Sequence, residues 1–337
     1  MFELSLKISP QLVRQIATIE RAVGRWEGIA ESESVASEQL RTRSIMRGVQ
    51  ASLSLDQSTP SSAGLPRTDA FIEGSPGANL TAAYDESFEL SQQAIERLYS
   101  ITTGAESHAV GAAAKQSSHW RSLQQQFIAT AELGLSERIV FPTLQPFLVK
   151  QRFEELLKWT TTELSQGTFH PLIVIGLFHL LFLQIHPFET ANHRVAILLS
   201  WQLLRANEFD FVEYNHFAPY FSERRDEYFT ALRQAEKTVR GSWATLPMWL
   251  EFFCAALQES AQRLLAFGDR RLSTERLTSV QKRILDVIRS HGPISREHIV
   301  SQTGINLSTV KYNLGVLSGR GHLMRLGGGR TTSYRLL

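Results

Sequence analysis

The stretch HPFETANHR, residues 186–194, lies between two apolar segments of helical character. The segment before it, PLIVIGLFHLLFLQI (171–185), is interrupted by His179, and its 15 residues fall short of the ~20 that span a bilayer. The segment after it, RVAILLSWQLL (194–204), is similarly apolar. Helices this apolar are buried rather than placed at a surface. We therefore expect HPFETANHR to be a loop between two core helices, with His179 as a core histidine.

The residues of this loop suit the binding of a phosphate group. A helix is expected to start near Asn192, and the N–H groups at a helix start lie at the positive end of its dipole. His186 can act as a general base, and Arg194 can bind phosphate oxygens through its guanidinium fork. The loop therefore predicts a site that handles phosphoryl groups.

The order of these residues resembles the core motif of the Fic/Doc (Fido) family, HxFx(D/E)(G/A)N(G/K)R. His186, Phe188, Asn192 and Arg194 keep the family spacing, and Ala191 matches the Doc-like and phosphocholine-transferring branches. The resemblance implies that His186 takes the proton from a target hydroxyl. It also implies that Asn192 and Arg194 bind the phosphates of a nucleotide, expected to be ATP, and that Phe188 anchors the loop.

Three positions depart from the family pattern. Thr190 stands where a carboxylate usually binds Mg²⁺, so a role for this ion is doubtful and its ligands are unknown, although Glu189 is a possible substitute. His193 stands where the family has Gly or Lys, and it either pairs with phosphate or fills space. Ile197 replaces the last arginine of the AMP-transferring motif.

The resemblance extends over roughly residues 10–265. Residues 123–145 look like the family's flap hairpin, with strands expected at 123–129 and 138–141, and the flap implies a protein target bound as an added strand. Tyr228 either helps to wall the adenine pocket or is an ordinary core aromatic residue.

Many Fic proteins carry an inhibitory helix with the pattern (S/T)xxxE(G/N). The stretch RTRSIMRGVQASLSL (41–55) is similar to the usual N-terminal version of that helix. Arg47 takes the place of the inhibitory glutamate in this alignment. This interpretation predicts that the inhibitory acid has been lost.

The C-terminal residues 277–337 resemble a winged helix-turn-helix domain. The segments 277–292, 294–304 and 306–321 have helical patterns, with Asn306 as the expected N-cap of the third, and 322–337 alternates around a glycine turn like a two-stranded wing. From residue 270 onward there are twelve Arg or Lys and three Asp or Glu, a charge of +9, and the whole chain has +2, which leaves 2 − 9 = −7 for the rest. Such asymmetry favours a polyanionic partner for this module.

If this module binds DNA, its third helix is expected to enter the major groove and its wing to contact phosphates. The candidate DNA-binding residues are Ser308, Thr309, Lys311, Tyr312, Asn313, Arg325 and Arg330. The alternative is that the module packs on the body of its own chain or on a second subunit, which would make a homodimer.

The sequence as a whole predicts a mainly α fold: a Fido helical core with a small β-hairpin flap, plus the C-terminal winged helix-turn-helix domain. We expect an N-terminal helical region with a Pro/Gly-rich loop at 1–90, the core at 91–268 and the module at 277–337. The start of the chain does not resemble a signal peptide, and Cys254 is its single cysteine, so a cytoplasmic protein without a membrane association is expected.

Two functions from different classes fit these observations. The first is a Fic-type transferase that uses ATP to modify a protein hydroxyl, with AMP transfer favoured, phosphate transfer of the Doc type as a variant, and activity possibly reduced. The second is a catalytically weakened Fido domain that binds a nucleotide and serves as the sensor of a DNA-binding transcriptional regulator. Thr190, Arg47 and Ile197 favour the second, and the intact His186 favours the first.

Overall fold

We describe the protein from a computed structural model that covers residues 8–30, 38–56, 76–86, 88–103, 120–122, 126–130, 138–239, 246–275, 277–328 and 332–337. The chain divides into two compact units, Met1–Ala266 and Phe267–Leu337. The first unit contains both the expected N-terminal helical region and the expected core. Among the described residues, no helix is long and apolar enough to cross a membrane.

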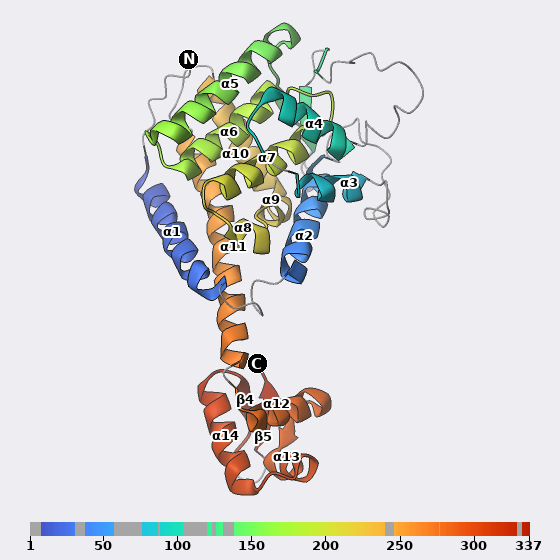
Figure 1. Ribbon diagram of the computed structural model, residues 1–337, viewed down its shortest axis with the longest axis vertical. Helices are drawn as coiled ribbons and strands as arrows, with labels where there is room; N and C mark the ends of the chain where they lie inside the picture. The colour runs from blue at the N-terminus through green and yellow to red at the C-terminus, as the bar shows by residue number, and fades with distance from the viewer. Residues whose placement is uncertain are drawn as a thin grey trace. The chain divides into compact units, whose positions relative to one another are not determined.

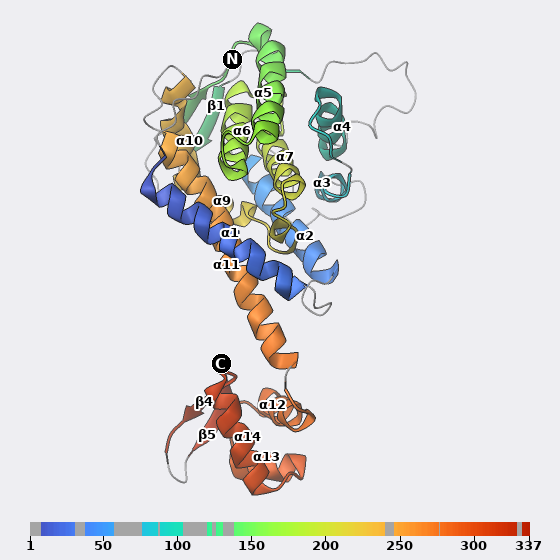
Figure 2. The ribbon, with the colours of Figure 1, turned by 60° about the vertical axis from the view of Figure 1, so that its left-hand side comes forward.

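Two antiparallel helices form the centre of the first unit (Figures 1 and 2): α6 (Pro171–Ile185) and α7 (Asn192–Ala206). Nearly every residue of both helices is buried, as their apolar sequences predict. Pro171 occupies the first turn of α6, where its fixed φ suits a helix start and its missing N–H costs nothing. Residues 186–191 join the two helices, and the last three motif residues, Asn192–Arg194, form the first turn of α7, so the motif is held between two rigid elements.

Further helices surround this pair. They are α1 (Pro10–Ala30), α2 (Glu38–Asp56), α3 (Pro76–Ala83), α4 (Gln92–Thr103), α5 (Pro146–Gln166), α8 (Phe211–Tyr214), α9 (Ala218–Glu223), α10 (Arg225–Val239) and α11 (Leu246–Glu275). Helix α5 packs against α6, and α2 packs against α7, α8 and α9. Gly48 allows the close approach of α2, because a β-carbon there would lie 2.1 Å from the His216 ring.

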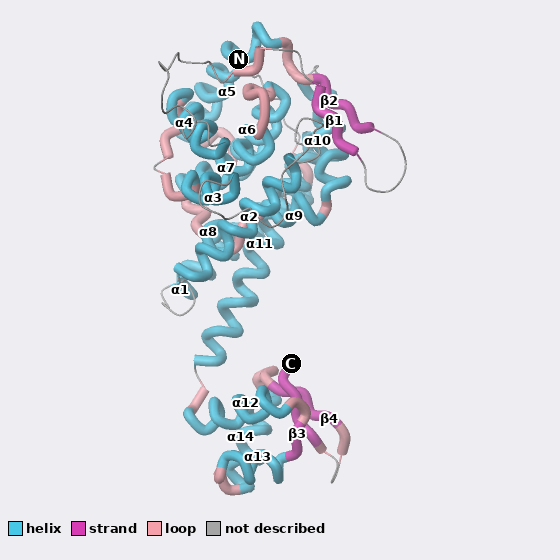
Figure 3. The backbone as a smooth tube through the Cα atoms, turned by 90° about the vertical axis from the view of Figure 1, so that its right-hand side faces the viewer, coloured by secondary structure: helices cyan, strands magenta, loops and turns pink. Residues whose placement is uncertain are grey.

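The expected flap is present as a hairpin of two antiparallel strands (Figure 3), β1 (Gln126–Thr130) and β2 (Arg138–Pro142). Their register pairs Ile128 with Val140, and β2 lies next to α10. The mainly α fold with a small hairpin is therefore confirmed. The turn between the strands, residues 131–137, lies outside the described residues.

The second unit begins within α11 and continues with short helices and a small sheet. The elements follow in the order α12 (Ser279–His291), β3 (Ile294–Ser295), α13 (Arg296–Thr303), α14 (Leu307–Gly319), β4 (Leu323–Leu326) and β5 (Ser333–Leu336). The sheet has the strand order β3-β5-β4, and all pairs are antiparallel. Its core contains Ile284, Ile299, Val310 and Leu317, which come from all three helices. The unit thus has its own hydrophobic core.

Two breaks separate consecutive helices of the first unit. Residues 84–91 lie between α3 and α4, and Arg224 lies between α9 and α10. At the second break the Arg224 backbone has φ −116° and ψ 47°, and α10 starts at the next residue. Tyr84 is completely buried against Trp201 and His216, so tertiary packing, which a local pattern does not encode, determines the first break.

Candidate phosphate-binding site at the start of helix α7

The motif loop contains two residues in the left-handed backbone region. His186 has φ 50° and ends α6, and Ala191 has φ 64° and precedes α7. This conformation costs a residue with a β-carbon roughly 1–2 kcal/mol. The two residues reverse the chain between two helices. Ala191, the N-cap residue of α7, has no capping group, so its side chain accepts from none of the first N–H groups of that helix.

Arg121 and Trp120 contact this loop, and Trp120 forms an isolated antiparallel bridge with Phe188. The buried Arg121 guanidinium donates to the backbone carbonyl oxygens of His186 (2.9 Å), Leu144 (2.5 Å) and Ile185 (3.3 Å). The Arg121 backbone N–H donates to the Pro187 carbonyl oxygen at 2.9 Å. Arg121 therefore supports the loop through the backbone of the loop.

Asn192 and Phe188 hold the inside of the loop. The Asn192 side chain accepts from the Phe188 N–H at 3.0 Å and donates to the Phe188 carbonyl oxygen at 2.8 Å. The Phe188 ring is fully buried and stacks on Tyr99 with 4.1 Å between ring centroids. This packing agrees with the expectation that Phe188 anchors the loop. Asn192 contributes to the loop by fixing its backbone, and its contact with phosphate stays a prediction.

The two residues considered for a metal ion do not form a carboxylate site. Thr190 is exposed, and its hydroxyl lies 3.4 Å from the Tyr99 hydroxyl. Glu189 is exposed and accepts from Ser122 at 3.3 Å. Over the part of the chain that the structure describes, no three His, Cys, Asp or Glu side chains gather as metal ligands would. The donor set thus does not fit Mg²⁺, a hard cation that prefers carboxylates.

Burial keeps His186 neutral. Its exposed fraction is 7%, and burial, together with the nearby positive Arg121, lowers the pKa of His186 to about 3. A neutral imidazole can accept a proton, so His186 is in the form that a general base requires at physiological pH.

The second motif histidine, His193, belongs to a buried chain of hydrogen bonds. Ser200 donates to the Ala196 carbonyl oxygen at 2.7 Å, so its oxygen accepts from His179 Nδ1 at 2.9 Å. His179 Nε2 then accepts from the Tyr228 hydroxyl at 3.2 Å, and the Tyr228 oxygen accepts from His193 Nδ1 at 3.1 Å.

This chain assigns a neutral tautomer to His193, with its proton on Nδ1. Burial lowers the pKa of His193 well below its usual value, so the side chain adds no positive charge to the site. Tyr228 is fully buried, and its position is that of a core aromatic residue whose hydroxyl joins two histidines. Contacts of Tyr228 and His193 with a nucleotide remain predictions.

An acidic side chain from α2 lies at the start of α7. The Asp56 carboxylate forms an ion pair with Arg194 Nε at 2.5 Å and also accepts from the backbone N–H groups of His193 and Arg194. Asp56 is 7% exposed. Burial raises the pKa of Asp56, and Arg194 with the two N–H groups acts against that rise. The position that we assigned to phosphate is therefore filled by a carboxylate.

Sequence reasoning missed Asp56, because the alignment placed Arg47 at the inhibitory position. The signal was present in another register, since Ser52 and Asp56 have the spacing of the serine and the acid in the pattern (S/T)xxxE. Both residues lie on the buried side of α2, whereas Arg47 is exposed.

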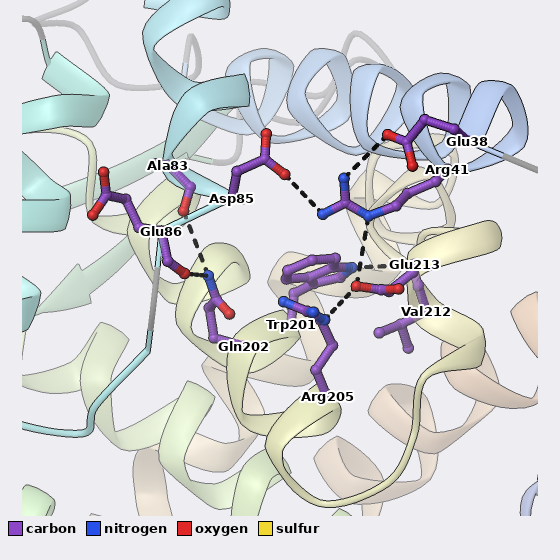
Figure 4. A network of polar contacts seen from close by, with 10 residues as sticks. All are labelled: Glu38, Arg41, Ala83, Asp85, Glu86, Trp201, Gln202, Arg205, Val212 and Glu213. Carbon is purple, nitrogen blue, oxygen red and sulfur yellow. Dashed lines mark hydrogen bonds and ion pairs between the residues drawn. The ribbon is translucent and has the colours of Figure 1, made fainter.

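The other end of α2 is fixed by a network of charged groups (Figure 4). The Arg41 guanidinium contacts Asp85 at 2.8 Å, Glu38 at 3.5 Å and Glu213 at 3.6 Å. Glu213 in turn contacts Arg205 of α7 at 2.5 Å. Helix α2 is thus attached to the body by Arg41 near its start and by Asp56 at its end.

In the second unit, most of the candidate DNA-binding residues lie on one side of α14. Ser308, Lys311 and Tyr312 are exposed, Tyr312 to 72%, and Thr309 is half-buried. Asn313 is only 6% exposed and donates to the Thr309 carbonyl oxygen at 2.8 Å, so its expected exposure was wrong. This back-bond within the helix is common for Asn and is not visible in a pattern of polar residues.

The wing is described in part. Arg325 is exposed on β4, and Arg330 lies outside the described residues. Three helices and then the strand pair β4–β5 follow in the order of the sequence pattern, with the short strand β3 as an additional element. The assignment as a winged helix-turn-helix domain stays a prediction.

Comparisons with known proteins agree with this geometry. Residues 82–204 match the family model described as Fic/DOC family, and that range includes the whole motif. No curated protein matches the chain. A solved structure of a Fic family protein from Desulfovibrio desulfuricans G20 is similar with 20% identity and a TM-score of 0.63, and the match covers 100% of this chain and 98% of that one.

A Fic domain containing signaling protein from Bacteroides thetaiotaomicron VPI-5482 is similar with 14% identity and a TM-score of 0.52, and the match covers 74% of this chain and 96% of that one. At these identities the likeness concerns the fold. The protein therefore has the Fic fold, with a Fic/DOC region at residues 82–204.

Proposed function

We propose that the protein is a Fic-type transferase that uses ATP to modify a protein hydroxyl, with transfer of AMP as the favoured reaction. The observation that carries this proposal is the placement of a neutral His186 next to an anion-binding helix start, in a loop held rigidly by Arg121 and Asn192. A base and a phosphate site in one rigid loop provide the proximity that group transfer needs.

In the proposed step, the hydroxyl oxygen of the target attacks the α-phosphorus of ATP. The new O–P bond forms as the bond to the β-phosphate oxygen breaks, pyrophosphate leaves, and the hydroxyl proton passes to His186. Arg194 and the N–H groups at the start of α7 bind phosphate oxygens through charge-assisted hydrogen bonds. Because Thr190 and Glu189 do not fit a metal site, no part of this step depends on a metal ion.

The hairpin gives the target a place to bind. Within the described residues its sheet consists of β1 and β2 alone, so each strand has one edge open to pairing. An extended segment of a target can add to such an edge through main-chain hydrogen bonds. We propose that the flap, residues 123–145, binds the target in this way.

We further propose that Asp56 competes with the nucleotide for the start of α7. A phosphate group and the Asp56 carboxylate require the same guanidinium and the same N–H groups, so the end of α2 must leave before the phosphate binds. The unmodified protein is then expected to bind ATP weakly.

The experiment that tests the transferase is incubation of the Asp56→Asn protein with ATP and mass spectrometry of the protein itself. A mass increase of one AMP that disappears in Asp56→Asn/His186→Ala supports the proposal. Addition of a single phosphate would instead indicate the Doc-type variant. Labelling that persists without His186 would contradict the assigned base.

One specific observation favours the second function, a DNA-binding regulator. The second unit carries a basic excess, and an exposed face of its helix α14 includes Lys311 and Tyr312. We propose that this face binds duplex DNA, with α14 in the major groove and Arg325 on the backbone.

The test of DNA binding compares the full chain with Lys311→Glu/Arg325→Glu on duplex DNA at several salt concentrations. Loss of the Arg325 phosphate contact is expected to reduce the salt slope by about one, and loss of Lys311 from the groove is expected to weaken binding further. Lys150→Glu, an exposed change in the first unit, is the charge control. Equal weakening by the control and by the double variant would contradict the assigned face.

A further inference from the structure

A cavity of about 250 Å³ lies between α2, the turn before α9, α9 itself and α11. It belongs to the first unit, and none of its lining residues is part of the HPFETANHR loop. Arg47, Gln50, Ala51 and Ser54 line it at positions i, i+3, i+4 and i+7 of α2, so they form one face of that helix. The cavity is separate from the motif but shares a helix with Asp56.

The wall that α9 and α11 form is electrically balanced. Arg224, just behind this wall, contacts Glu259 at 3.1 Å and Glu223 at 3.9 Å. Arg263 contacts the same two carboxylates, Glu223 at 3.8 Å and Glu259 more closely. Two guanidinium groups thus pair with two carboxylates, so this cluster of four side chains has no net charge as a whole.

The wall that α2 forms carries a charge that this cluster does not balance. Arg47 is exposed at the cavity, and no carboxylate among the described residues forms an ion pair with it. Gln50 adds an amide one turn further along the helix. A guanidinium binds a carboxylate through two parallel N–H···O bonds, which makes this wall complementary to a single negative charge.

The lining between the two walls combines polar and apolar side chains. The Phe217 ring is 1% exposed and lines the cavity together with Pro219 and Ala256. The hydroxyl groups of Ser222 and Ser260 also line it, but each already donates to a backbone carbonyl oxygen. The apolar side chains offer a contact surface to the body of a small ligand, and the two serine hydroxyl groups do not require a partner from it. The volume is below the ~300–1,000 Å³ of sites for drug-sized ligands, so the ligand is small.

We propose that this cavity is a binding site for a small carboxylic acid with an apolar or aromatic body. Arg47 binds the carboxylate, and Phe217, Pro219 and Ala256 contact the body. The balanced cluster on α9 and α11 adds no net positive charge, so the site favours a single carboxylate over ligands of higher negative charge.

The position of the site on α2 gives the ligand a route to the motif. Ser54 lines the cavity, its carbonyl oxygen accepts from Arg225 at 3.0 Å, and Asp56 follows two residues later. A ligand that joins Arg47 to α9 and α11 holds α2 in place, and with it the Asp56–Arg194 pair. This consequence rests on the proposed competition between Asp56 and nucleotide, whereas binding in the cavity does not.

The test uses benzoate and its neutral analogue benzamide as probes, which have the same shape and differ in charge. Each is titrated into the full chain at up to ~10 mM, a range that detects millimolar binding, and followed by ligand-observed NMR. The variants are Arg47→Ala and Arg47→Glu. Arg43→Ala, another exposed arginine of α2 that does not line the cavity, is the control. Because Arg47 is exposed, its replacement leaves the fold intact.

Binding of benzoate that weakens at least about fivefold in Arg47→Ala, disappears in Arg47→Glu and stays unchanged in Arg43→Ala supports the proposal. Absence of benzoate binding overturns it. Equal binding of benzamide, or benzoate binding that does not depend on Arg47, overturns it as well. None of these measurements involves ATP, so failure here and failure of the transferase proposal are distinguishable.

Discussion

The starts of two helices, α14 and α7, are completed in different ways. At α14 the N-cap residue Asn306 accepts from the Thr309 N–H at 2.8 Å, so the cap comes from the adjacent sequence. At α7 the N-cap residue is Ala191, which has no such group, and Asp56 of α2 accepts from the first N–H groups instead. A local cap stabilises a helix permanently, whereas a cap from another helix can be exchanged for an anion of similar chemistry. The start of α14 is therefore stabilised within its own sequence, whereas the start of α7 is suited to exchange Asp56 for another anion.

The two units are also expected to differ in their response to acid, which is the largest predicted effect. His179, His186 and His216 are buried, and burial lowers the pKa of each to about 3, with His193 also well below its usual value. Histidines of the unfolded state bind protons below pH ~6.5, whereas the buried histidines of the folded state do not. The free energy of unfolding therefore falls as the pH falls from ~6.5 toward 3. Four such groups reduce the free energy of unfolding by roughly 6 kcal/mol between about pH 6.5 and pH 5.

Tryptophan fluorescence checks this prediction, because all six tryptophans lie within the first unit. In the second unit His291 and His298 are exposed. Fluorescence is therefore expected to report acid unfolding while part of the helical circular dichroism persists. Simultaneous loss of both signals, or fluorescence that does not change down to about pH 4, would contradict the account.

The next effect concerns the pair that completes α7. In Arg194→Ala the Asp56 carboxylate stays buried with its two N–H donors but without its counter-charge. The free energy of unfolding is expected to fall by ~3–5 kcal/mol. Urea denaturation followed by tryptophan fluorescence measures it. Asp56→Asn/Arg194→Ala is the control and is expected to recover part of the lost free energy of unfolding. A loss below ~1 kcal/mol for Arg194→Ala alone would show that the Asp56–Arg194 pair stabilises the fold no more than an exposed ion pair does.

The local cap of α14 is expected to have a smaller effect. Asn306→Ala removes the side chain that accepts from Thr309 and is expected to destabilise the second unit by ~1 kcal/mol. Thermal unfolding by circular dichroism detects this change, and the tryptophan transition of the first unit serves as the internal reference. A shift of the tryptophan transition alone would disagree with a cap that acts within its own unit.

The smallest effect is expected at Ala191. Glycine adopts φ 64° without the steric cost that the β-carbon of alanine has there. Against this gain, glycine loses more backbone conformational entropy on folding than alanine does. Ala191→Gly is therefore expected to stabilise the first unit by ~0.5–1 kcal/mol, measured from the urea midpoint. Ala196→Gly, inside α7, is the matched control and is expected to destabilise. Equal destabilisation by both changes would mean that the Ala191 backbone carries no strain.

The features that local sequence determines were predicted well. The apolar helices α6 and α7, the motif loop and the hairpin follow from hydrophobic periodicity and residue order, as does the Asn306 cap. The short gap between β1 and β2 also made their pairing visible in the sequence.

The features that depend on distant contacts were not predicted. Asp56 and Arg194 are 138 positions apart, and no local pattern joins them. The hydroxyl of Tyr228 joins His179 to His193 only because three helices meet there. Arg121 supports the motif loop from a segment 65 residues earlier. These side chains complete the site. The sequence therefore indicated the chemistry of the site but not the distant residues that contact it.

The most direct test of the account is the affinity for ATP of Asp56→Asn compared with the unchanged protein, measured by calorimetric titration. Asparagine has a similar shape and lacks the charge that competes with phosphate for Arg194 and the start of α7. The account predicts that Asp56→Asn binds ATP about tenfold more tightly, and that the gain is lost when Arg194→Ala is added. Equal or weaker binding by Asp56→Asn, in a protein shown by circular dichroism to be folded, would contradict the claim that Asp56 stands in the place of a nucleotide phosphate.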